Sequence, residues 1–265
     1  MSSPLAQLLE RVRSENRAAL IGYMPAGFPT KEECIQAIQA MVDGGVDAVE
    51  IGYPYSDPVM DGPVIQAAAE LSLENGTGAQ DVFDIVEATV AMGVPAVVMT
   101  YWNPIERYGV EKFAAELARR GGSGVITPDL TVEESAGWKS ASESNEINRI
   151  YVVAPSTSEA RMPLVTSQCS GFVYAASLMG VTGTRTSVSG SARDLVARIR
   201  STTDTPVAVG LGVSTKEQAH EVAAYADGVI VGSAFIRQLQ ESSSIHEGLA
   251  KVTALAQSLA EGVRR

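Results

Sequence analysis

Short apolar runs alternate along the chain with longer segments in which apolar residues recur every three or four positions. The first run, residues 19–24, precedes residues 31–42, where Ile35, Ile38 and Met41 share one helical face. Similar apolar runs follow at intervals, most with helical spacing after them. They lie at residues 48–51, 96–101, 124–127, 150–153, 171–174, 206–209 and 228–231. The pattern therefore predicts strands that alternate with helices.

Strands that are apolar along their whole length are typical of a parallel sheet covered by helices on both faces. Eight such units in 265 residues favour a closed (β/α)8 barrel, the TIM-barrel fold, which usually takes about 250 residues. A doubly wound open sheet is the competing interpretation. We expect one domain over residues 1–265, with extra helices after the second strand and at the C-terminus. These extra helices are predicted at residues 63–73, 79–92 and 244–263.

Composition narrows the class of protein. Hydrophobic residues make up 45% of the chain, which is enough for a large core, and the net charge is −11. This negative charge disfavours binding to nucleic acid or to anionic membranes. No apolar run reaches the ~20 residues of a membrane span, and the N-terminus does not resemble a signal peptide. We expect a cytoplasmic protein that interacts with neither nucleic acid nor membrane.

The chemistry open to the chain is limited by where its reactive side chains fall. His220 and His246 lie in predicted helices and belong to no cluster of metal ligands, which disfavours metal catalysis. Every lysine falls in a predicted helix or at its start, so no strand supplies an amine for a Schiff base. Cys34 and Cys169 are assigned to helical segments, away from the mouth of the barrel. Carboxylates remain as the candidate catalytic groups.

Three carboxylates are expected at the C-terminal ends of strands, where the active sites of these barrels lie. Glu50 interrupts an otherwise apolar strand and would be costly to bury unless it were protonated or paired. It is a structural ion-pair partner, a residue at an exposed strand end, or an acid and base whose pKa burial has raised. Asp57 and Asp61, in the loop that follows, are both possible as the second candidate, although Asp before Gly and Pro, as at Asp61, is also ordinary turn chemistry. Asp129, after the fourth strand, is more simply a cap or a loop tie.

Glycine-rich turns follow the last three strands, at residues 180–183, 210–214 and 231–234. Glycine permits close approach of backbone N–H groups, and a helix N-terminus favours a phosphate without any lysine. Ser233 is expected to be the N-cap of the helix after the eighth strand. Together these turns predict a phosphate site of the kind found in such barrels.

The segment VEIGYPYSDP at residues 49–58, followed by DGPVIQ at 61–66, closely resembles the signature of the tryptophan synthase alpha subunit. The similarity continues in MTYWNP at 99–104, PDL at 128–130 and GVTG at 180–183, so it covers nearly the whole chain. The resemblance implies a lyase of tryptophan biosynthesis that cleaves indole-3-glycerol phosphate to indole and glyceraldehyde 3-phosphate. This retro-aldol reaction uses neither a metal nor a Schiff base.

The resemblance also assigns roles to residues. Glu50 matches the general acid and base that protonates the indole at C3 and assists deprotonation of the glycerol hydroxyl. Asp61 matches the carboxylate that binds the indole N–H and stabilises positive charge on the ring. Tyr101 and Tyr174 match positions near the indole, and Tyr23 and Ile126 are further candidate apolar walls. The matching phosphate-binding positions are Gly183, Gly212, Gly232 and Ser233. Thr182 matches a loop residue that closes on the Asp61 side, which implies a lid over residues 180–191.

The family works with a beta subunit that uses pyridoxal phosphate, so the resemblance implies no cofactor on this chain and an alpha2-beta2 heterotetramer with allosteric coupling. The loop over residues 53–61 is expected to face the beta subunit, and the isolated chain to be a weak catalyst. The sequence departs from the common family pattern at Phe28, Thr131 and Trp102, which bears on loop contacts and on coupling to the partner.

Three other functions remain open. A lyase of the same chemistry could act alone and release free indole. A barrel without catalytic activity could bind a phosphate ligand and regulate a partner, although it would have no chemical use for both Glu50 and Asp61. A phosphosugar isomerase would account for the glycines but not for residues 56–63.

Overall fold

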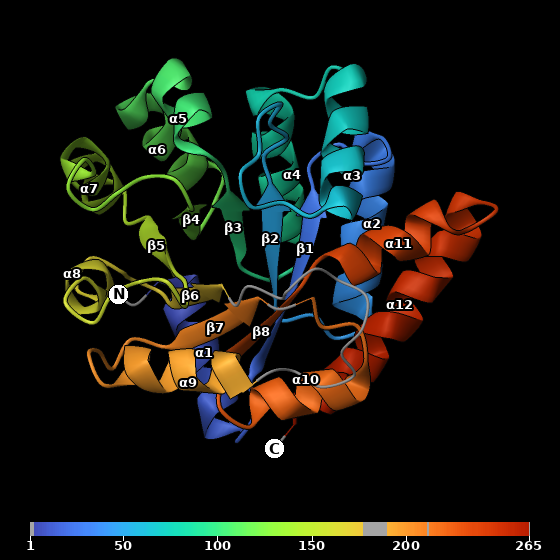
Figure 1. The fold of residues 1–265 in the computed structure, drawn as a ribbon. Coiled ribbons are helices and arrows are strands. Elements are labelled where there is room, and N and C mark those ends of the chain that lie inside the picture. Colours follow the sequence, from blue (N-terminus) through green and yellow to red (C-terminus); the bar gives the residue numbers. More distant parts are fainter. Residues whose placement is uncertain (1–2, 177–189, 211, 265) are drawn as a thin grey trace.

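The computed structural model describes residues 3–176, 190–210 and 212–264. Within them, parallel strands pair in chain order and close into a barrel that helices surround (Figure 1). The strands are β1 (Ala19–Pro25), β2 (Ala48–Gly52), β3 (Ala96–Met99), β4 (Gly124–Thr127), β5 (Asn148–Val153), β6 (Val173–Ala176), β7 (Val207–Gly210) and β8 (Gly228–Val231). The predicted (β/α)8 barrel is therefore confirmed, and the open sheet is excluded because β1 pairs with β8.

Helices connect the strands on the outside of the barrel. They are α1 (Pro4–Ser14), α2 (Lys31–Asp43), α3 (Pro63–Glu74), α4 (Ala79–Ala91), α5 (Trp102–Tyr108), α6 (Val110–Arg119), α7 (Ala136–Ser144), α8 (Met162–Thr166), α9 (Gly190–Arg200), α10 (Lys216–Ala223), α11 (Ser233–Gln240) and α12 (Ile245–Gly262). The predicted extra helices after β2 are α3 and α4, and the predicted C-terminal helix is α12. No described helix is long and apolar enough to cross a bilayer.

The strands are buried because helices cover them from outside while side chains fill the barrel. Every residue of β1, β2, β3, β4 and β8 is buried, as the apolar runs predict. Glu50 is the one ionisable side chain in these five strands, apart from Tyr23. The ladder pairs Tyr23 of β1 with Glu50 of β2, and Glu50 with Val97 of β3. Glu50 therefore lies in a strand that is paired on both sides, and not at an exposed strand end.

The C-terminal segment meets the start of β1 beside the seam between β1 and β8. Helix α12 packs on α2, α10 and α11, so it covers the first and the last parts of the barrel together. A methyl group on Gly44, at the end of α2, would lie 2.4 Å from the Cβ of Ala256 in α12, so glycine permits this close contact. The backbone N–H of Ala18 donates to the carbonyl of Val263 at 3.0 Å. The C-terminal helix therefore belongs to the barrel's closure.

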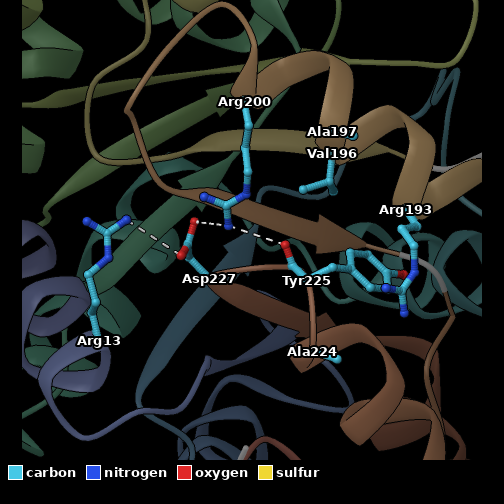
Figure 2. Close-up of a pocket in the computed structure, with 8 residues that line it drawn as sticks. All are labelled: Arg13, Arg193, Val196, Ala197, Arg200, Ala224, Tyr225 and Asp227. Atoms are coloured by element: carbon cyan, nitrogen blue, oxygen red, sulfur yellow. Dashed lines mark hydrogen bonds and ion pairs between the residues drawn. The ribbon is translucent and has the colours of Figure 1, made fainter.

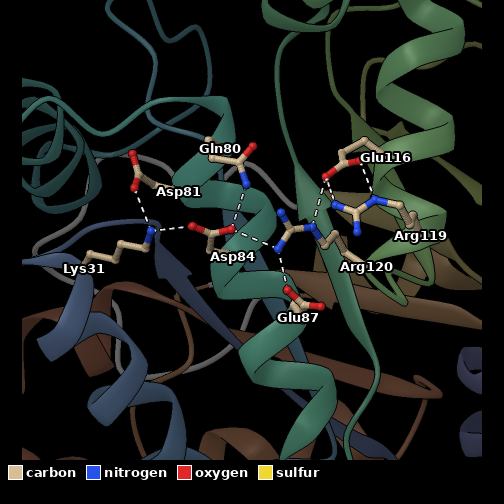
Figure 3. A network of polar contacts seen from close by, with 8 residues as sticks. All are labelled: Lys31, Gln80, Asp81, Asp84, Glu87, Glu116, Arg119 and Arg120. Atoms are coloured by element: carbon tan, nitrogen blue, oxygen red, sulfur yellow. Dashed lines mark hydrogen bonds and ion pairs between the residues drawn. The ribbon is translucent and has the colours of Figure 1, made fainter.

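A chain of ion pairs joins α2, α4 and α6 on the outside (Figure 3). Lys31 at the start of α2 donates to Asp81 at 2.9 Å and to Asp84 at 2.6 Å, both on α4. Arg120, just after α6, reaches Asp84 at 2.9 Å and Glu116 at 3.0 Å. The backbone N–H of Gly78 and the Lys31 ammonium hold the pKa of Asp81 below its usual range, and Lys31, with Gln80 and Arg120, does the same for Asp84. The network fixes the helices around β2 and β3.

The structure corrects several predicted boundaries. The third strand ends at Met99, two residues before the predicted end, and Tyr101 is instead the residue that precedes α5. The sixth strand begins at Val173, because Gly171 has a φ of +81° that a strand cannot contain. Cys169 lies after α8 and not in a helix, whereas Cys34 lies in α2 as predicted. The periodicity did not lead us to predict α1 or α8.

Candidate active site

Glu50 is buried in the barrel with only 1% of its surface exposed. In the described part of the chain its Oε2 atom has no hydrogen-bond partner. Burial, with a further contribution from the negative charge of Asp61, raises the pKa of Glu50 from 4.5 to about 8. Among the described residues no cation pairs with Glu50, so the interpretation of this residue as one half of a structural ion pair finds no support there. The carboxyl is neutral at pH 7 and can give up its proton near that pH.

Two buried tyrosines lie close to this carboxyl. Burial holds the pKa of Tyr23 and Tyr174 well above the usual value, and the negative charges of Glu50 and Asp61 raise both further. Glycine makes room for each ring. A methyl group on Gly52 would lie 2.3 Å from the Tyr23 hydroxyl oxygen. Both phenols are therefore neutral and form part of the surroundings of Glu50.

The equivalent glycine beside Tyr174 is Gly210, at the end of β7, where a methyl group would lie 2.3 Å from the Tyr174 hydroxyl oxygen. Each tyrosine thus extends across the C-terminal end of a neighbouring strand. The sequence does not reveal this arrangement, since neither pair is adjacent along the chain.

Asp61 lies in the loop after β2, where it is partly buried. Burial raises its pKa, and the Tyr101 hydroxyl opposes this shift by hydrogen bonding to the carboxylate. The same hydroxyl accepts hydrogen bonds from the backbone N–H groups of Val59 and Met60, at 3.1 and 3.2 Å. Tyr101 therefore holds the loop that carries Asp61, a role that sequence reasoning missed when it assigned this ring to the pocket wall.

The loop after β2 also presents apolar side chains to the outside. Val59 is 76% exposed and Met60 38% exposed, which is unusual for large apolar residues. The Tyr55 ring packs on Tyr101 with centroids 5.2 Å apart. Tyr101 thus anchors the loop to the barrel, while the apolar side chains at the tip of the loop are exposed.

The glycine turns after β7 and β8 lie at the same end of the barrel as Glu50. Gly212 has a φ of +69° and open space where a side chain would be. Gly232 precedes α11 and lies so close to Tyr23 that a methyl group would be 3.1 Å from its ring. Ser233 is the first residue of α11, so its prediction as the N-cap is wrong by one position, and Gly232 is the N-cap. Helix α11 begins two residues after β8 ends, so its N-terminus lies at the mouth of the barrel.

The other predicted residues are buried in a strand, bonded within a loop or outside the described part of the chain. Ile126 is fully buried in the middle of β4, as part of the core. Gly183, Thr182 and most of the proposed lid over 180–191 lie outside the described residues. Asp129 accepts from the backbone N–H of Trp102 at 2.9 and 3.1 Å, which is the loop tie that the sequence favoured.

The arrangement combines a neutral carboxyl, a second carboxylate and a helix N-terminus at one end of a barrel. The carboxyl can deliver and recover a proton near neutral pH. The second carboxylate can hold an N–H group or stabilise a developing positive charge. The helix N-terminus can bind an anion. These groups fit a substrate that carries a phosphate and a ring that must be protonated.

The sequence model described as "Tryptophan synthase alpha chain" matches residues 9–264. The chain belongs to this family. The tryptophan synthase alpha chain of Streptomyces coelicolor is 57% identical, over 98% of this chain and 96% of its own, and that of Acidothermus cellulolyticus is 53% identical, over 98% and 97%. A structure of Mycobacterium tuberculosis tryptophan synthase matches with a TM-score of 0.93 at 48% identity, and covers 100% of both chains.

As a tryptophan synthase alpha chain, the protein is a carbon–carbon lyase of tryptophan biosynthesis that cleaves indole-3-glycerol phosphate. The resemblance drawn from residues 49–66 is thereby confirmed. A tryptophan synthase alpha chain works with a beta subunit. Among the residues that the structure describes, no group of three or more His, Cys, Asp or Glu side chains is placed to hold a metal ion.

Proposed function

We propose that Glu50 is the proton-transfer group of this lyase and that Asp61 stabilises the charge that forms on the indole ring. Protonated Glu50 gives its proton to C3 of the indole, and the ring nitrogen becomes positively charged beside Asp61. The carboxylate of Glu50 then takes the proton of the glycerol hydroxyl as the carbon–carbon bond breaks. The bonding electrons return to the ring, which releases indole and glyceraldehyde 3-phosphate. The observation that carries this proposal is the burial of Glu50, whose Oε2 atom has no hydrogen-bond partner among the described residues and whose pKa is raised to about 8.

The remaining site residues hold the substrate in this proposal. Tyr23, Tyr101, Tyr174 and Ile126 surround the indole, and the phosphate binds at Gly212, Gly232 and Ser233. The open space at Gly212 and the N-terminus of α11 support this placement of the phosphate. Gly183 and Thr182 complete the site from the loop after β6.

We place the beta subunit on the loop over residues 53–61, in an alpha2-beta2 heterotetramer. The exposed Val59 and Met60 support this contact, because large apolar side chains at a loop tip are typical of a protein interface. The cofactor, pyridoxal phosphate, belongs to the beta subunit, and none is assigned to this chain. The complex works in the cytoplasm.

The deciding measurement is release of indole from indole-3-glycerol phosphate by the purified chain, with and without a beta subunit. We expect slow release alone and a strong increase with the partner. Fast release by the isolated chain would instead support a lyase that acts alone. If neither condition released indole while the phosphate ligand still bound, the chain would be a regulatory barrel.

The roles of the two carboxylates are tested by Glu50→Gln and Asp61→Asn. An amide at residue 50 keeps the shape but cannot carry the proton, so we expect turnover to fall by at least about a thousandfold while substrate affinity changes little. Asp43→Asn is the control, since Asp43 is an exposed carboxylate at the end of α2 that bonds only to Gln39 among the described contacts. Near-normal turnover in Glu50→Gln would overturn the assignment.

A further inference from the structure

A groove of about 490 Å³ lies on the outside of the barrel, between α9 and the segment that joins α10 to β8. Arginines line it from two helices: Arg13 comes from α1, and Arg193 and Arg200 come from α9 (Figure 2). Asp227 is the one carboxylate among its lining residues. In a chain with a net charge of −11, this grouping of guanidinium groups around one acid is unexpected.

The single carboxylate of the lining, Asp227, already contacts two of the arginines. Asp227 accepts the backbone N–H of Val207 and the Arg200 guanidinium, both at 2.9 Å, and lies 3.7 Å from Arg13. An arginine has five N–H donors, and these contacts use only part of those on Arg13 and Arg200. Glu221, one turn before Tyr225, also acts on the Tyr225 hydroxyl, yet it does not line the groove. The lining therefore keeps an excess of positive charge.

Arg193 faces the groove in a different way. Its guanidinium lies over the Tyr225 ring, 4.9 Å from the centroid, so the side chain is held by stacking. Stacking leaves the edge of a guanidinium free to donate to an anion, because the fork of N–H groups lies in its plane. Figure 2 shows Arg193 at one end of the groove, and Arg13 and Arg200 grouped around Asp227 toward the other. Cationic groups thus occur at both ends.

The lining also includes small apolar residues. Ala197 of α9 and Ala224, which follows α10, are exposed, whereas Val196 of α9 is almost fully buried. The volume falls within the ~300–1,000 Å³ of typical small-molecule pockets. Guanidinium groups bind carboxylate and phosphate groups by paired hydrogen bonds, and apolar side chains favour a hydrocarbon or aromatic portion beside them.

We propose that this groove binds a small organic anion, with its carboxylate or phosphate on the arginines and its apolar portion on Ala197 and Ala224. The groove reaches the opposite end of the strands from Glu50, because Asp227 immediately precedes β8. Its occupant therefore does not touch the reacting atoms. The inference does not depend on the mechanism proposed above.

The test uses the full chain, with phenyl phosphate and phenylacetate as the two anionic probes and benzyl alcohol as the neutral one. Since phenyl phosphate is also expected at the N-terminus of α11, the readout must be local. We would follow the backbone amide NMR signals of Ala197 and Ala224 for the groove and that of Ser233 for the other site. We expect at least one anion to shift the groove signals in a saturable manner, and benzyl alcohol not to do so.

Arg193→Gln is the deciding variant, since Arg193 is exposed and its loss should leave the fold intact. We expect it to weaken the groove response at least about tenfold, the effect of losing one charged hydrogen bond, while the Ser233 response is retained. Arg13→Gln gives an independent second variant. Arg119→Gln is the matched control, an exposed arginine on α6 that is paired with Glu116 and lies outside the groove. Groove signals that respond to neither anion, or equally in Arg193→Gln and in the control, would overturn the proposal.

Discussion

The raised pKa of Glu50 ties the stability of the barrel to pH. In the folded chain the carboxyl keeps its proton up to about pH 8, whereas in the unfolded chain it releases the proton near 4.5. The contribution of Glu50 to stability is therefore fully present below pH 4.5 and is lost as the pH rises through 8. The loss is on the order of 5 kcal/mol at high pH, from ~1.36 kcal/mol for each pKa unit.

This dependence predicts that Glu50→Gln stabilises the chain at alkaline pH. The amide stays neutral at every pH, so the variant should not lose the stability that the wild-type chain loses between pH 4.5 and 8. Urea unfolding of both proteins at pH 5, 7 and 9 checks this, and the difference in the free energy of unfolding should grow with pH in favour of the variant. A constant difference across that range would show that Glu50 is not buried with a raised pKa.

Tyr101 illustrates a different kind of side chain, one that acts by holding a loop. Tyr101→Phe removes the oxygen that accepts from Val59 and Met60 and that bonds to Asp61. We expect a loss of about 1–2 kcal/mol in stability and a fall in kcat, because the loop that carries Asp61 loses its anchor. Steady-state kinetics and thermal unfolding measure the two effects.

The control for this change is Tyr108→Phe, since Tyr108 packs against Phe83 and Phe113, and its hydroxyl has no described hydrogen bond to Val59, Met60 or Asp61. It should leave kcat nearly unchanged. Equal kinetics for Tyr101→Phe and Tyr108→Phe would rule out an anchoring role for the Tyr101 hydroxyl.

These two residues also mark what could be foreseen from the sequence. Glu50 could be found because a charge within an apolar strand breaks a local pattern. The contacts of Tyr101 could not, because its hydroxyl meets residues that lie more than 40 positions earlier. The same holds for the arginines of α1 and α9, which only the closed barrel brings to one groove.

The sequence predicts the strands well because apolar runs are local in the chain. It predicts the strand boundaries less well, because the conformation of a single residue can set them. All eight strands occur in the predicted order because apolar runs repeat along the chain. The start of β6 was misplaced because Gly171 adopts a left-handed conformation, which its apolar neighbours conceal. The end of β3 was misplaced because Tyr101 is buried without belonging to the ladder.

The packing of Tyr23 across the end of β2 predicts that Gly52→Ala is destabilising. The added methyl group would meet the Tyr23 ring at 2.3–2.8 Å, so the ring must move, at a cost of about 1–3 kcal/mol. Substrate affinity should fall as well, because Tyr23 lies beside Glu50. Chemical denaturation and KM report these changes.

Two further variants test this explanation. In a Tyr23→Leu background the same glycine change should cost less, since the clashing atoms are gone. Gly137→Ala is the control, because Gly137 lies in α7 with nothing within 4 Å of the new methyl group. It should stabilise the chain by about 0.5–1 kcal/mol.

The barrel as a whole depends on its last helix. Removing residues 245–265 would uncover α2, α10 and α11 and delete the bond between Ala18 and Val263. We expect the shortened chain to lose the cooperative unfolding transition, because α2, α10 and α11, which flank the seam between β1 and β8, then lose the helix that joins them. Circular dichroism with urea checks this, and a two-state transition of normal midpoint would show that α12 is dispensable.

Because Ala19 of β1 pairs with Gly228 of β8, the barrel cannot close until β8 has been synthesised. At about 5–20 residues per second, translation leaves the first strand without its second neighbour for roughly 10–40 s. Throughout this interval two strand edges are open, one at each end of the growing sheet, and open edges invite pairing with other chains. The ribosome-bound stage is therefore when this protein is most prone to aggregate, and chaperones that shield strand edges are most useful to it before synthesis is complete.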